Sequence, residues 1–339
     1  MRGVVMHSPG VVEVEDLDEP RILEPTDAII GLAASCICGS DLWRYRGTVP
    51  TDRFPMGHEY VGVVQEIGSE VRNLQVGDFV VGSFMRSDNT CEICRAGFQS
   101  RCAHPGAGGV SGAQAERLRV PLADGTLVAT PGRPDEDLIP ALLAASDVLG
   151  TGWFGAVAAE AGPGKTVAVV GDGAVGLMAI LAARHLGAER IIAASRHPRR
   201  QELARYYGAT DIVEERGGEG VARIRELTGG LGAHSVIEAV GTQESFMQAV
   251  GATRAGGHLG FVGVNHEVQI PGIELFGACI HTLGGPAPVR RFLPELIRLI
   301  WDREIDPGRV FDLVLPLSEA AEGYRAMDER RAIKVMLTV

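Results

Sequence analysis

The 339-residue sequence has no stripe of basic residues. Its 43 acidic and 32 basic side chains are spread along the chain and give a formal net charge of −11 at pH 7. A protein that binds nucleic acid concentrates Lys and Arg on one surface to neutralise phosphates. We therefore expect no nucleic-acid partner.

Long apolar runs are also missing. The most apolar stretch, residues 174–183, is about half of the roughly 20 residues that a membrane span needs. The N-terminus lacks the charged start and apolar core of a signal peptide, and no tandem repeat or low-complexity tract occurs. The composition, 45% hydrophobic and 22% charged, is ordinary for a globular protein. We expect a cytoplasmic protein with no membrane partner.

Cysteine is sparse, with six residues, but two of them, Cys91 and Cys94, have the spacing of a metal site. In an intracellular chain this spacing indicates metal binding rather than disulfides. Glycine is abundant instead, with 45 residues, nearly twice its usual share. Many positions must therefore need a positive φ or a close backbone approach.

The apolar pattern changes along the chain. Up to about residue 129 the apolar runs are short, β-rich and separated by Gly, Pro and Asp, which predicts a β-rich domain. After the proline-rich segment 130–140, strand patterns alternate with helical ones, which predicts an α/β domain with a parallel sheet. The expected strands are 166–170, 190–195, 235–240, 258–264 and 279–285, the expected helices 174–187, 199–208 and 289–302, and 334–339 is a closing strand.

Three glycines form a G-x-G-x-x-G loop between the first expected strand and helix of this second domain: Gly171, Gly173 and Gly176. In that setting they allow a tight turn, the approach of a pyrophosphate and close helix–strand packing. The loop predicts dinucleotide binding. A glycine-rich turn of some other α/β protein is the alternative.

The second strand of the α/β domain ends at Ser195, where an NAD-binding site would carry Asp or Glu for the ribose hydroxyls. Arg196 and Arg200 follow, which places a hydroxyl and two cations where a 2′-phosphate would bind. We expect NADP(H) to be preferred over NAD(H). Alternatively, these arginines are only the solvated face of the next helix.

A thiol and an imidazole lie twenty residues apart in the β-rich domain, at Cys38 and His58. A catalytic zinc takes three protein ligands and leaves its fourth position open. Two residues alone could equally be a buried thiol and a histidine of the core.

The segment around His58, GHEYVGVVQEIGSEV (57–71), resembles the zinc signature of the medium-chain alcohol dehydrogenases. The resemblance covers essentially the whole chain, including Cys-Gly-Ser-Asp from Cys38, a cysteine-rich lobe near residue 90, the glycine loop and an Ile-Lys-Val ending. It implies a GroES-like catalytic domain, residues 1–147 completed by 289–339, and a Rossmann domain, a doubly wound parallel sheet, at 148–288. The implied activity is hydride transfer between an alcohol and a nicotinamide cofactor, with zinc polarising the oxygen. From this resemblance together with the residues that follow the second strand, we expect an alcohol dehydrogenase or carbonyl reductase that acts on a primary or secondary alcohol and uses NADP.

Carried over residue by residue, the resemblance makes Cys38 and His58 two ligands of a catalytic zinc. The third is Asp147, where many relatives have cysteine, and a carboxylate oxygen is an acceptable zinc ligand. Glu59 matches an acid that in some members moves to the metal. Ser40 matches the hydroxyl that hydrogen-bonds the substrate alkoxide.

The family's proton-relay histidine is replaced by Trp43. The proton would then leave through the nicotinamide ribose and water, or through another base. His7, His104 and His266 are unassigned candidates for that base. Trp43 and Phe84 would be walls of the substrate pocket, or simply aromatic residues of the core.

The resemblance also implies a structural zinc in the lobe, bound by Asp88, Cys91, Cys94 and Cys102, so that each chain would hold two zincs. All four positions would be filled by protein. The alternative is an empty lobe held by packing. Toward the cofactor, the resemblance implies that Lys334 reaches the pyrophosphate, and that three residues lie beside the nicotinamide: Thr151, Val262 and Val264.

Two rival functions remain. One is a zinc-free NADPH reductase of activated double bonds on the same fold, whose members typically lack the Cys and Gly-His-Glu ligands. The other is a non-catalytic cofactor-binding protein. The expected partners are a small alcohol or carbonyl substrate and further copies of the chain, since the family forms homodimers and homotetramers.

Overall fold

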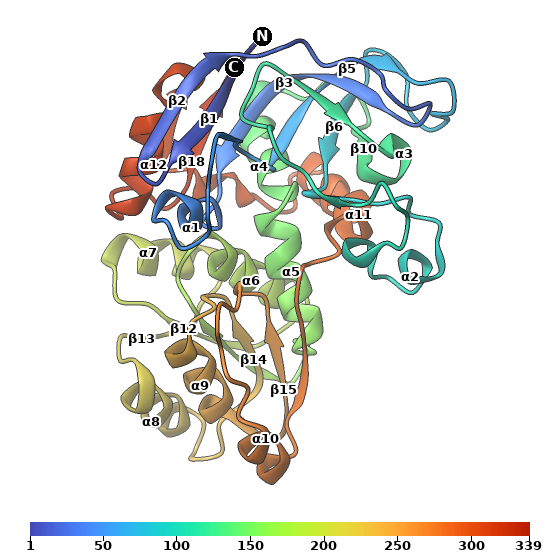
Figure 1. Ribbon diagram of the computed structural model, residues 1–339. Helices are drawn as coiled ribbons and strands as arrows, with labels where there is room; N and C mark the ends of the chain where they lie inside the picture. The colour runs from blue at the N-terminus through green and yellow to red at the C-terminus, as the bar shows by residue number, and fades with distance from the viewer. The chain divides into compact units, whose positions relative to one another are not determined.

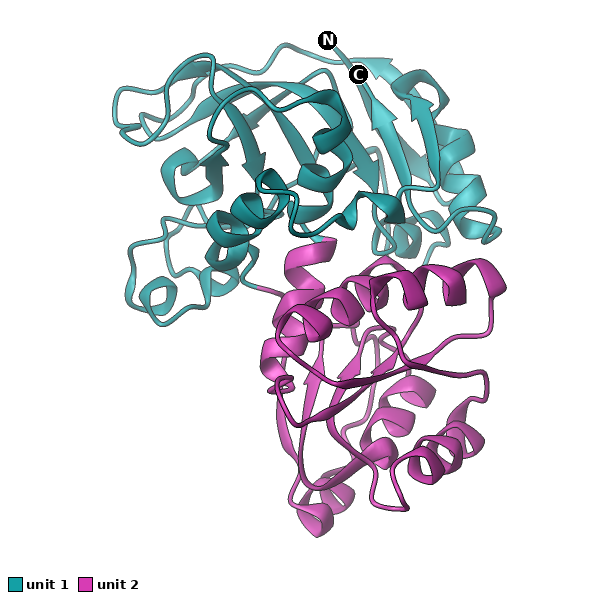
Figure 2. Ribbon diagram, turned by 180° about the vertical axis from the view of Figure 1, so that it is seen from behind, with its two compact units in different colours: residues 1–147, 288–339 teal, residues 148–287 magenta.

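The computed structural model describes residues 1–339, which divide into two units (Figure 2). Unit 1 comprises residues 1–147 and 288–339, and unit 2 comprises residues 148–287. The boundaries expected from the sequence, 147/148 and 288/289, differ from this division by at most one residue. Each unit has buried apolar clusters of its own.

Unit 1 is built mainly from antiparallel strands (Figure 1). A three-stranded sheet has the order β2(Val11–Asp16), β1(Arg2–Ser8), β4(Phe54–Pro55). A seven-stranded sheet has the order β10(Leu127–Ala129), β6(Phe79–Gly82), β5(Tyr60–Ile67), β3(Ala28–Ile37), β18(Val335–Thr338), β17(Leu313–Pro316), with β9(Arg117–Val120) also on β3. A short pair joins β7(Met85–Arg86) and β8(Gly108–Gly109).

The C-terminal strand completes unit 1. β18 pairs antiparallel with β3, in the register Leu337 opposite Ser35, and parallel with β17. Every residue of β18 except the last is buried, and the buried side chains are apolar on both faces, as expected for a strand that is covered on both sides. Residues 288–339 therefore belong to the sheet that the first 147 residues begin.

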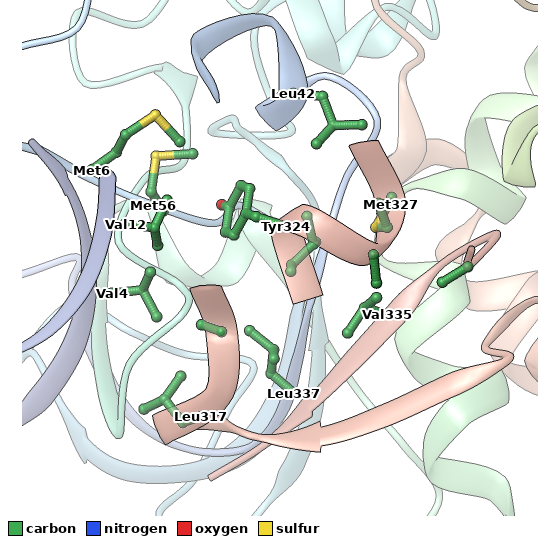
Figure 3. Close-up of a cluster of buried hydrophobic side chains, with 14 residues drawn as sticks. Val4, Met6, Val12, Leu42, Met56, Leu317, Tyr324, Met327, Val335 and Leu337 are labelled. Atoms are coloured by element: carbon green, nitrogen blue, oxygen red, sulfur yellow. The ribbon is translucent and has the colours of Figure 1, made fainter. Parts of the chain in front are cut away.

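Unit 1 also contains helices, most of which contact strands of its sheets. They are α1(Asp41–Tyr45), α2(Glu92–Arg95), α3(Ala123–Thr126), α4(Ile139–Ala145), α11(Val289–Trp301) and α12(Ala320–Asp328), with 3₁₀ turns at Gln99–Arg101, Glu136–Leu138, Pro307–Val310 and Leu317–Glu319. The α12 helix packs one face against β17 and β18 and contributes Tyr324 to the core (Figure 3). The expected helix at 289–302 is α11.

Unit 2 contains a six-stranded parallel sheet. Its order is β13(Asp211–Val213), β12(Arg190–Ala194), β11(Thr166–Val170), β14(Ala233–Glu238), β15(Thr253–Phe261), β16(His281–Gly284). Numbered within the unit this order is 3-2-1-4-5-6, that of a dinucleotide-binding Rossmann fold. The α/β fold class predicted from the sequence is confirmed. Its helices are α5(Val148–Ala158), α6(Ala174–His185), α7(Pro198–Tyr207), α8(Gly217–Leu227), α9(Gln243–Ala252) and α10(Gly272–Ala278).

No single helix has both the length and the apolar composition needed to cross a membrane. One pair of consecutive helices, residues 136–145 and 148–158, meets that test only when taken together.

Candidate functional site

Four side chains of unit 1 form a cluster that we call the inner cluster: Cys38, His58, Glu59 and Asp147. Cys38 follows β3, His58 and Glu59 precede β5, and Asp147 follows α4. One ligand atom from each lies within 4.8 Å of the others. The Cys38 thiol is 3.8 Å from Asp147 Oδ2, and His58 Nε2 is 3.3 Å from the same oxygen. The structure thus brings together the four residues that the sequence predicted for a catalytic metal.

Three side chains of the inner cluster are buried and His58 is half-buried, which shapes the electrostatics of the cluster. Glu59 is fully buried, and Cys38 and Asp147 are buried as well. Burial, followed by the charges of Glu59 and Asp147, raises the pKa of the Cys38 thiol. Burial alone lowers the pKa of His58, but Asp41, Cys38 and Asp147 outweigh it and raise that pKa well above its usual value. A concentration of acceptors that favours a cation is what a metal site requires.

His58 is oriented by a residue that the sequence analysis did not single out. Asp41 Oδ1 lies 3.4 Å from His58 Nδ1, and Asp41 Oδ2 accepts the backbone N–H of Cys38 at 3.0 Å. An acceptor at Nδ1 leaves Nε2, which faces Asp147, available to a metal. The signal was present, because Asp41 is the last residue of the Cys-Gly-Ser-Asp segment.

Glu59 is paired with the C-terminal strand. Lys334 Nζ donates to Glu59 Oε1 at 2.7 Å and to the carbonyl of Ile37 at 3.3 Å, and Lys334 is only 1% exposed. Burial alone lowers the pKa of Lys334, but Cys36, Glu59 and Cys38 outweigh it and raise that pKa well above its usual value. The Lys334 ammonium is thus paired with Glu59. That Lys334 reaches a pyrophosphate stays a prediction.

The donor set of the inner cluster fits zinc. A thiolate, an imidazole and carboxylate oxygens are all zinc ligands in proteins. Glu59 Oε2 is buried without a hydrogen-bond partner. A cation among these four side chains would satisfy that oxygen, which is otherwise costly to leave unpaired.

The expected substrate-side residues lie close to the inner cluster in sequence or space. Ser40 is the half-buried residue before α1, and its side chain makes no capping hydrogen bond there. Trp43 lies within α1 and is half-buried. The Phe84 ring meets the His58 ring edge-on, with centroids 6.2 Å apart. Phe84 therefore borders the cluster directly.

A second group, which we call the lobe cluster, comprises Asp88, Cys91, Cys94 and Cys102. Their ligand atoms also lie within 4.8 Å of one another. Backbone N–H groups point at them: Asp88 Oδ1 accepts from Thr90 at 2.8 Å and Cys91 at 3.0 Å, and Cys102 Sγ accepts from Asp88 at 3.4 Å. Burial tends to raise the pKa of Asp88, but these hydrogen bonds hold it well below its usual range. Four converging ligands with no open position suit a structural metal.

The glycine loop of unit 2 lies between β11 and α6. A Cβ atom at Gly176 would lie 2.0 Å from the carbonyl oxygen of Gly171, so only glycine permits this approach of helix to strand. A Cβ at Gly173 would meet nothing within 4 Å. The loop therefore has the packing that the G-x-G-x-x-G motif predicted.

Asp172 of the glycine loop lies beside Ser195, the residue that follows β12. Asp172 accepts the Ser195 hydroxyl at 2.9 Å and the Arg200 guanidinium at 2.9 Å. Arg196 is exposed. Arg200 is therefore not the free cation that the sequence suggested, because Asp172 neutralises it. The signal was the Asp inside Gly-Asp-Gly, which the motif treats as variable.

The remaining candidates fall on several elements. Thr151 is buried in α5, and after β15 Val262 is buried whereas Val264 is half exposed. Of the alternative bases, His7 pairs with Glu15 at 2.5 Å and His104 Nδ1 accepts the backbone N–H of Gly106 at 3.1 Å. Neither His7 nor His104 belongs to the inner cluster.

Comparison with known proteins gives a consistent answer. Residues 24–131 match the model of the alcohol dehydrogenase GroES-like domain, and residues 174–283 match that of the zinc-binding dehydrogenases. The chain is 36% identical to zinc-type alcohol dehydrogenase B of Aspergillus flavus, over 99% of this chain and 81% of that protein. It is 38% identical to a probable zinc-binding alcohol dehydrogenase of Mycobacterium tuberculosis, over 96% and 84%.

Among solved structures, the alcohol dehydrogenase TADH from Thermus sp. ATN1 superposes with a TM-score of 0.90. The two sequences are 35% identical, and the match covers all of both chains.

Proposed function

Because the chain belongs to the medium-chain zinc-dependent alcohol dehydrogenase family, we propose that it transfers a hydride between an alcohol and a nicotinamide cofactor, with a catalytic zinc in the inner cluster. The observation that carries the proposal is the convergence of Cys38, His58 and Asp147. Three protein ligands with an open position are the arrangement of a catalytic zinc. The glycine loop supports cofactor binding.

In this proposal Cys38, His58 and Asp147 hold the metal. A zinc bound there would act as a Lewis acid that lowers the pKa of the alcohol and stabilises the alkoxide. Ser40 would hydrogen-bond the alcohol oxygen, accept the alcohol's proton and pass its own hydroxyl proton on toward the nicotinamide ribose and water. Asp41 holds His58 by Nδ1, and Lys334 holds Glu59 by Oε1. Glu59 keeps its second oxygen unpaired, as a carboxylate that can move to the metal would need.

For the cofactor, we propose a preference for NADP(H) over NAD(H). Arg196 beside Ser195 supports it, because a guanidinium–phosphate hydrogen bond contributes about 1.5–3 kcal/mol, or roughly ten- to a hundred-fold in affinity. Asp172 acts in the opposite direction, since it neutralises Arg200 and places a negative charge beside Ser195. The preference therefore depends on Arg196.

Three substitutions test the cofactor proposal by the Michaelis constants for NADPH and NADH. Arg196→Ala should raise the Michaelis constant for NADPH by roughly ten- to a hundred-fold and leave that for NADH nearly unchanged. Asp172→Asn should remove the charge that neutralises Arg200 and so lower the Michaelis constant for NADPH. Ser195→Asp should place a negative charge where the 2′-phosphate would bind and so shift the preference to NADH. Equal or better use of NADH by the unaltered protein would refute the preference.

Two rival functions make different predictions. A zinc-free reductase of activated double bonds would turn over enones without metal, and a non-catalytic protein would bind cofactor without turnover. Zinc content, together with turnover on a panel of alcohols and enones followed by NADPH and NADH absorbance, separates the three. Alcohol oxidation that is lost on metal removal and restored by zinc supports the proposal.

For the lobe cluster, we propose a structural zinc held by Asp88, Cys91, Cys94 and Cys102, which brings the total to two per chain. A cytoplasmic location and a homodimeric or homotetrameric state remain expectations. Sedimentation of the full chain tests the latter.

A further inference from the structure

The Asp41 carboxylate that contacts His58 and Cys38 is itself held by a deeper residue. Gln114 Nε2 donates to Asp41 Oδ2 at 3.3 Å and to the carbonyl of Cys36 at 3.1 Å. Asp41 and Gln114 are both buried, so water does not compete for these hydrogen bonds. One amide group therefore fixes the acid beside the cluster and the strand that leads to Cys38.

Gln114 also braces the chain just before His58. Its backbone N–H donates to the carbonyl of Met56 at 3.0 Å, and Ala113 N–H donates to the carbonyl of Gly57 at 3.1 Å. Gly57 has φ +93°, and a Cβ there would lie 2.5 Å from the backbone nitrogen and Cγ of Gln114. The glycine of the Gly-His-Glu segment is thus required for Gln114 to approach.

Tyr324 of α12 fixes the direction of the Gln114 amide. Its hydroxyl donates to Gln114 Oε1 at 3.0 Å. Burial raises the pKa of Tyr324 well above its usual value, so the hydroxyl keeps its proton. With a donor at Oε1, the amide must present its NH₂ group to Asp41 and Cys36. Figure 3 shows Tyr324 among apolar side chains that include Met56 and Leu337, which hold its ring in place.

We propose that Gln114 and Tyr324 are positioning residues for the catalytic metal, acting through Asp41 on His58. This inference rests on the proposed function of the inner cluster. Outer partners fix the tautomer and the ring orientation of a metal-binding histidine, and their loss typically costs roughly 10–100-fold in metal affinity or activity. Tyr324 and Gln114 are 210 residues apart in the chain, and both are linked to His58 through Asp41.

The variant Tyr324→Phe tests the proposal because it removes one hydroxyl and keeps the ring. We expect its zinc affinity at the inner cluster to fall by about 10-fold, measured by competition with a chromophoric chelator, and the visible spectrum of the cobalt-substituted protein to change. The control is Tyr45→Phe, since the Tyr45 ring stacks on Tyr324 at 5.6 Å and no hydrogen bond joins it to Gln114. Measuring both in a Cys91→Ser background removes competition from the lobe cluster.

The second variant, Gln114→Glu, keeps the backbone contacts and replaces the NH₂ donor by an oxygen facing Asp41. We expect a larger loss of zinc affinity than in Tyr324→Phe. Unaltered zinc affinity and an unaltered cobalt spectrum in both variants overturn the proposal, and so does a lower melting temperature alone. If the unaltered chain binds no metal at the inner cluster, the proposed function fails instead, and the inference with it.

Discussion

The ligands of the inner cluster come from positions up to 109 residues apart, whereas those of the lobe cluster span at most 14. The inner cluster has one sulfur and is buried except for the half-buried His58. The lobe cluster has three sulfurs, and of its residues Cys94 is buried and the others are half-buried. Long-range packing places the side chains of the first. Backbone N–H groups of a single loop place those of the second.

This difference in how the ligands are positioned suggests a catalytic role for the inner cluster and a structural role for the lobe cluster. A site that depends on several elements can leave one coordination position open and still keep its geometry, because the fold holds the ligands. A loop with little apolar surface gains its order from the metal itself. We expect damage to the inner cluster to affect chemistry first and damage to the lobe cluster to affect stability first.

The largest effect should follow Asp147→Ala. Outer partners of a metal contribute roughly 10–100-fold, so losing a direct ligand should lower kcat/KM by more than about 100-fold. Elemental analysis should show one zinc fewer per chain. Asp135→Ala, at an exposed carboxylate that pairs with Arg303, is the control. Retained zinc would identify Glu59 as the third ligand, and full activity in metal-stripped protein would refute the catalytic site.

Breaking the Glu59–Lys334 pair should cost stability as well as activity. Lys334→Met leaves a buried carboxylate unpaired, which costs about 3–5 kcal/mol, or roughly 6–20 °C in melting temperature at about 2–4 °C per kcal/mol. The matched control is Lys165→Met, since Lys165 is the only other lysine and pairs with Glu160 at the surface. Adding Glu59→Gln to Lys334→Met should restore part of the loss. Equal melting temperatures for the two lysine variants would contradict this account.

Cys91→Ser should separate the two clusters in the other direction. Zinc should fall from about two to about one per chain. Metal binding at a free concentration of 100 Kd stabilises by about 2.7 kcal/mol, so the melting temperature should fall by roughly 5–11 °C. Activity per remaining inner-cluster zinc should stay nearly constant. Cys279→Ser, at an exposed cysteine of unit 2, is the control, and a stable variant with unchanged zinc would argue against a lobe metal.

The smallest effect is a pair of opposite pH dependences in the metal-free protein. The raised pKa of His58 gives stability that is complete below about pH 6.5 and is lost as pH rises through the raised value. The lowered pKa of Asp88 gives stability that is complete above about pH 4 and is lost as pH falls further. Thermal melts from acid to alkaline pH should lose the first slope in His58→Gln and the second in Asp88→Asn. Unchanged slopes in both variants would contradict the assignment.

Much of the fold could be predicted from the sequence. The alternation of β-rich runs with apolar helical runs after residue 140 corresponds to the strands and helices of unit 2, because side-chain periodicity is a local property. The glycine loop was predicted for the same reason. Family resemblance supplied the residues of both clusters, and the structure brings each set together.

The contacts that set charge and orientation could not be predicted in this way. Lys334 pairs with Glu59, which lies 275 residues away in the chain. Asp172 pairs with Arg200, 28 residues away, and so neutralises a cation that was expected to bind the cofactor. A sequence shows that a cation and an acid exist, but not which acid a buried cation will meet. That choice follows from burial, which makes an unpaired charge too costly to leave.

By itself, the sequence determined the types of the helices and strands, the glycine loop between the first strand and helix of unit 2, and the chemical kinds of ligand. Periodicity and residue identity are local properties, so a sequence contains them directly. Only the tertiary structure decided that β18 pairs with β3 and that Lys334 pairs with Glu59. It also decided that Tyr324 hydrogen-bonds Gln114 and that Gln114 hydrogen-bonds Asp41. Those pairings arise when strands distant in the chain share one sheet and one core. Their buried polar groups must then find partners among the residues that packing has placed beside them.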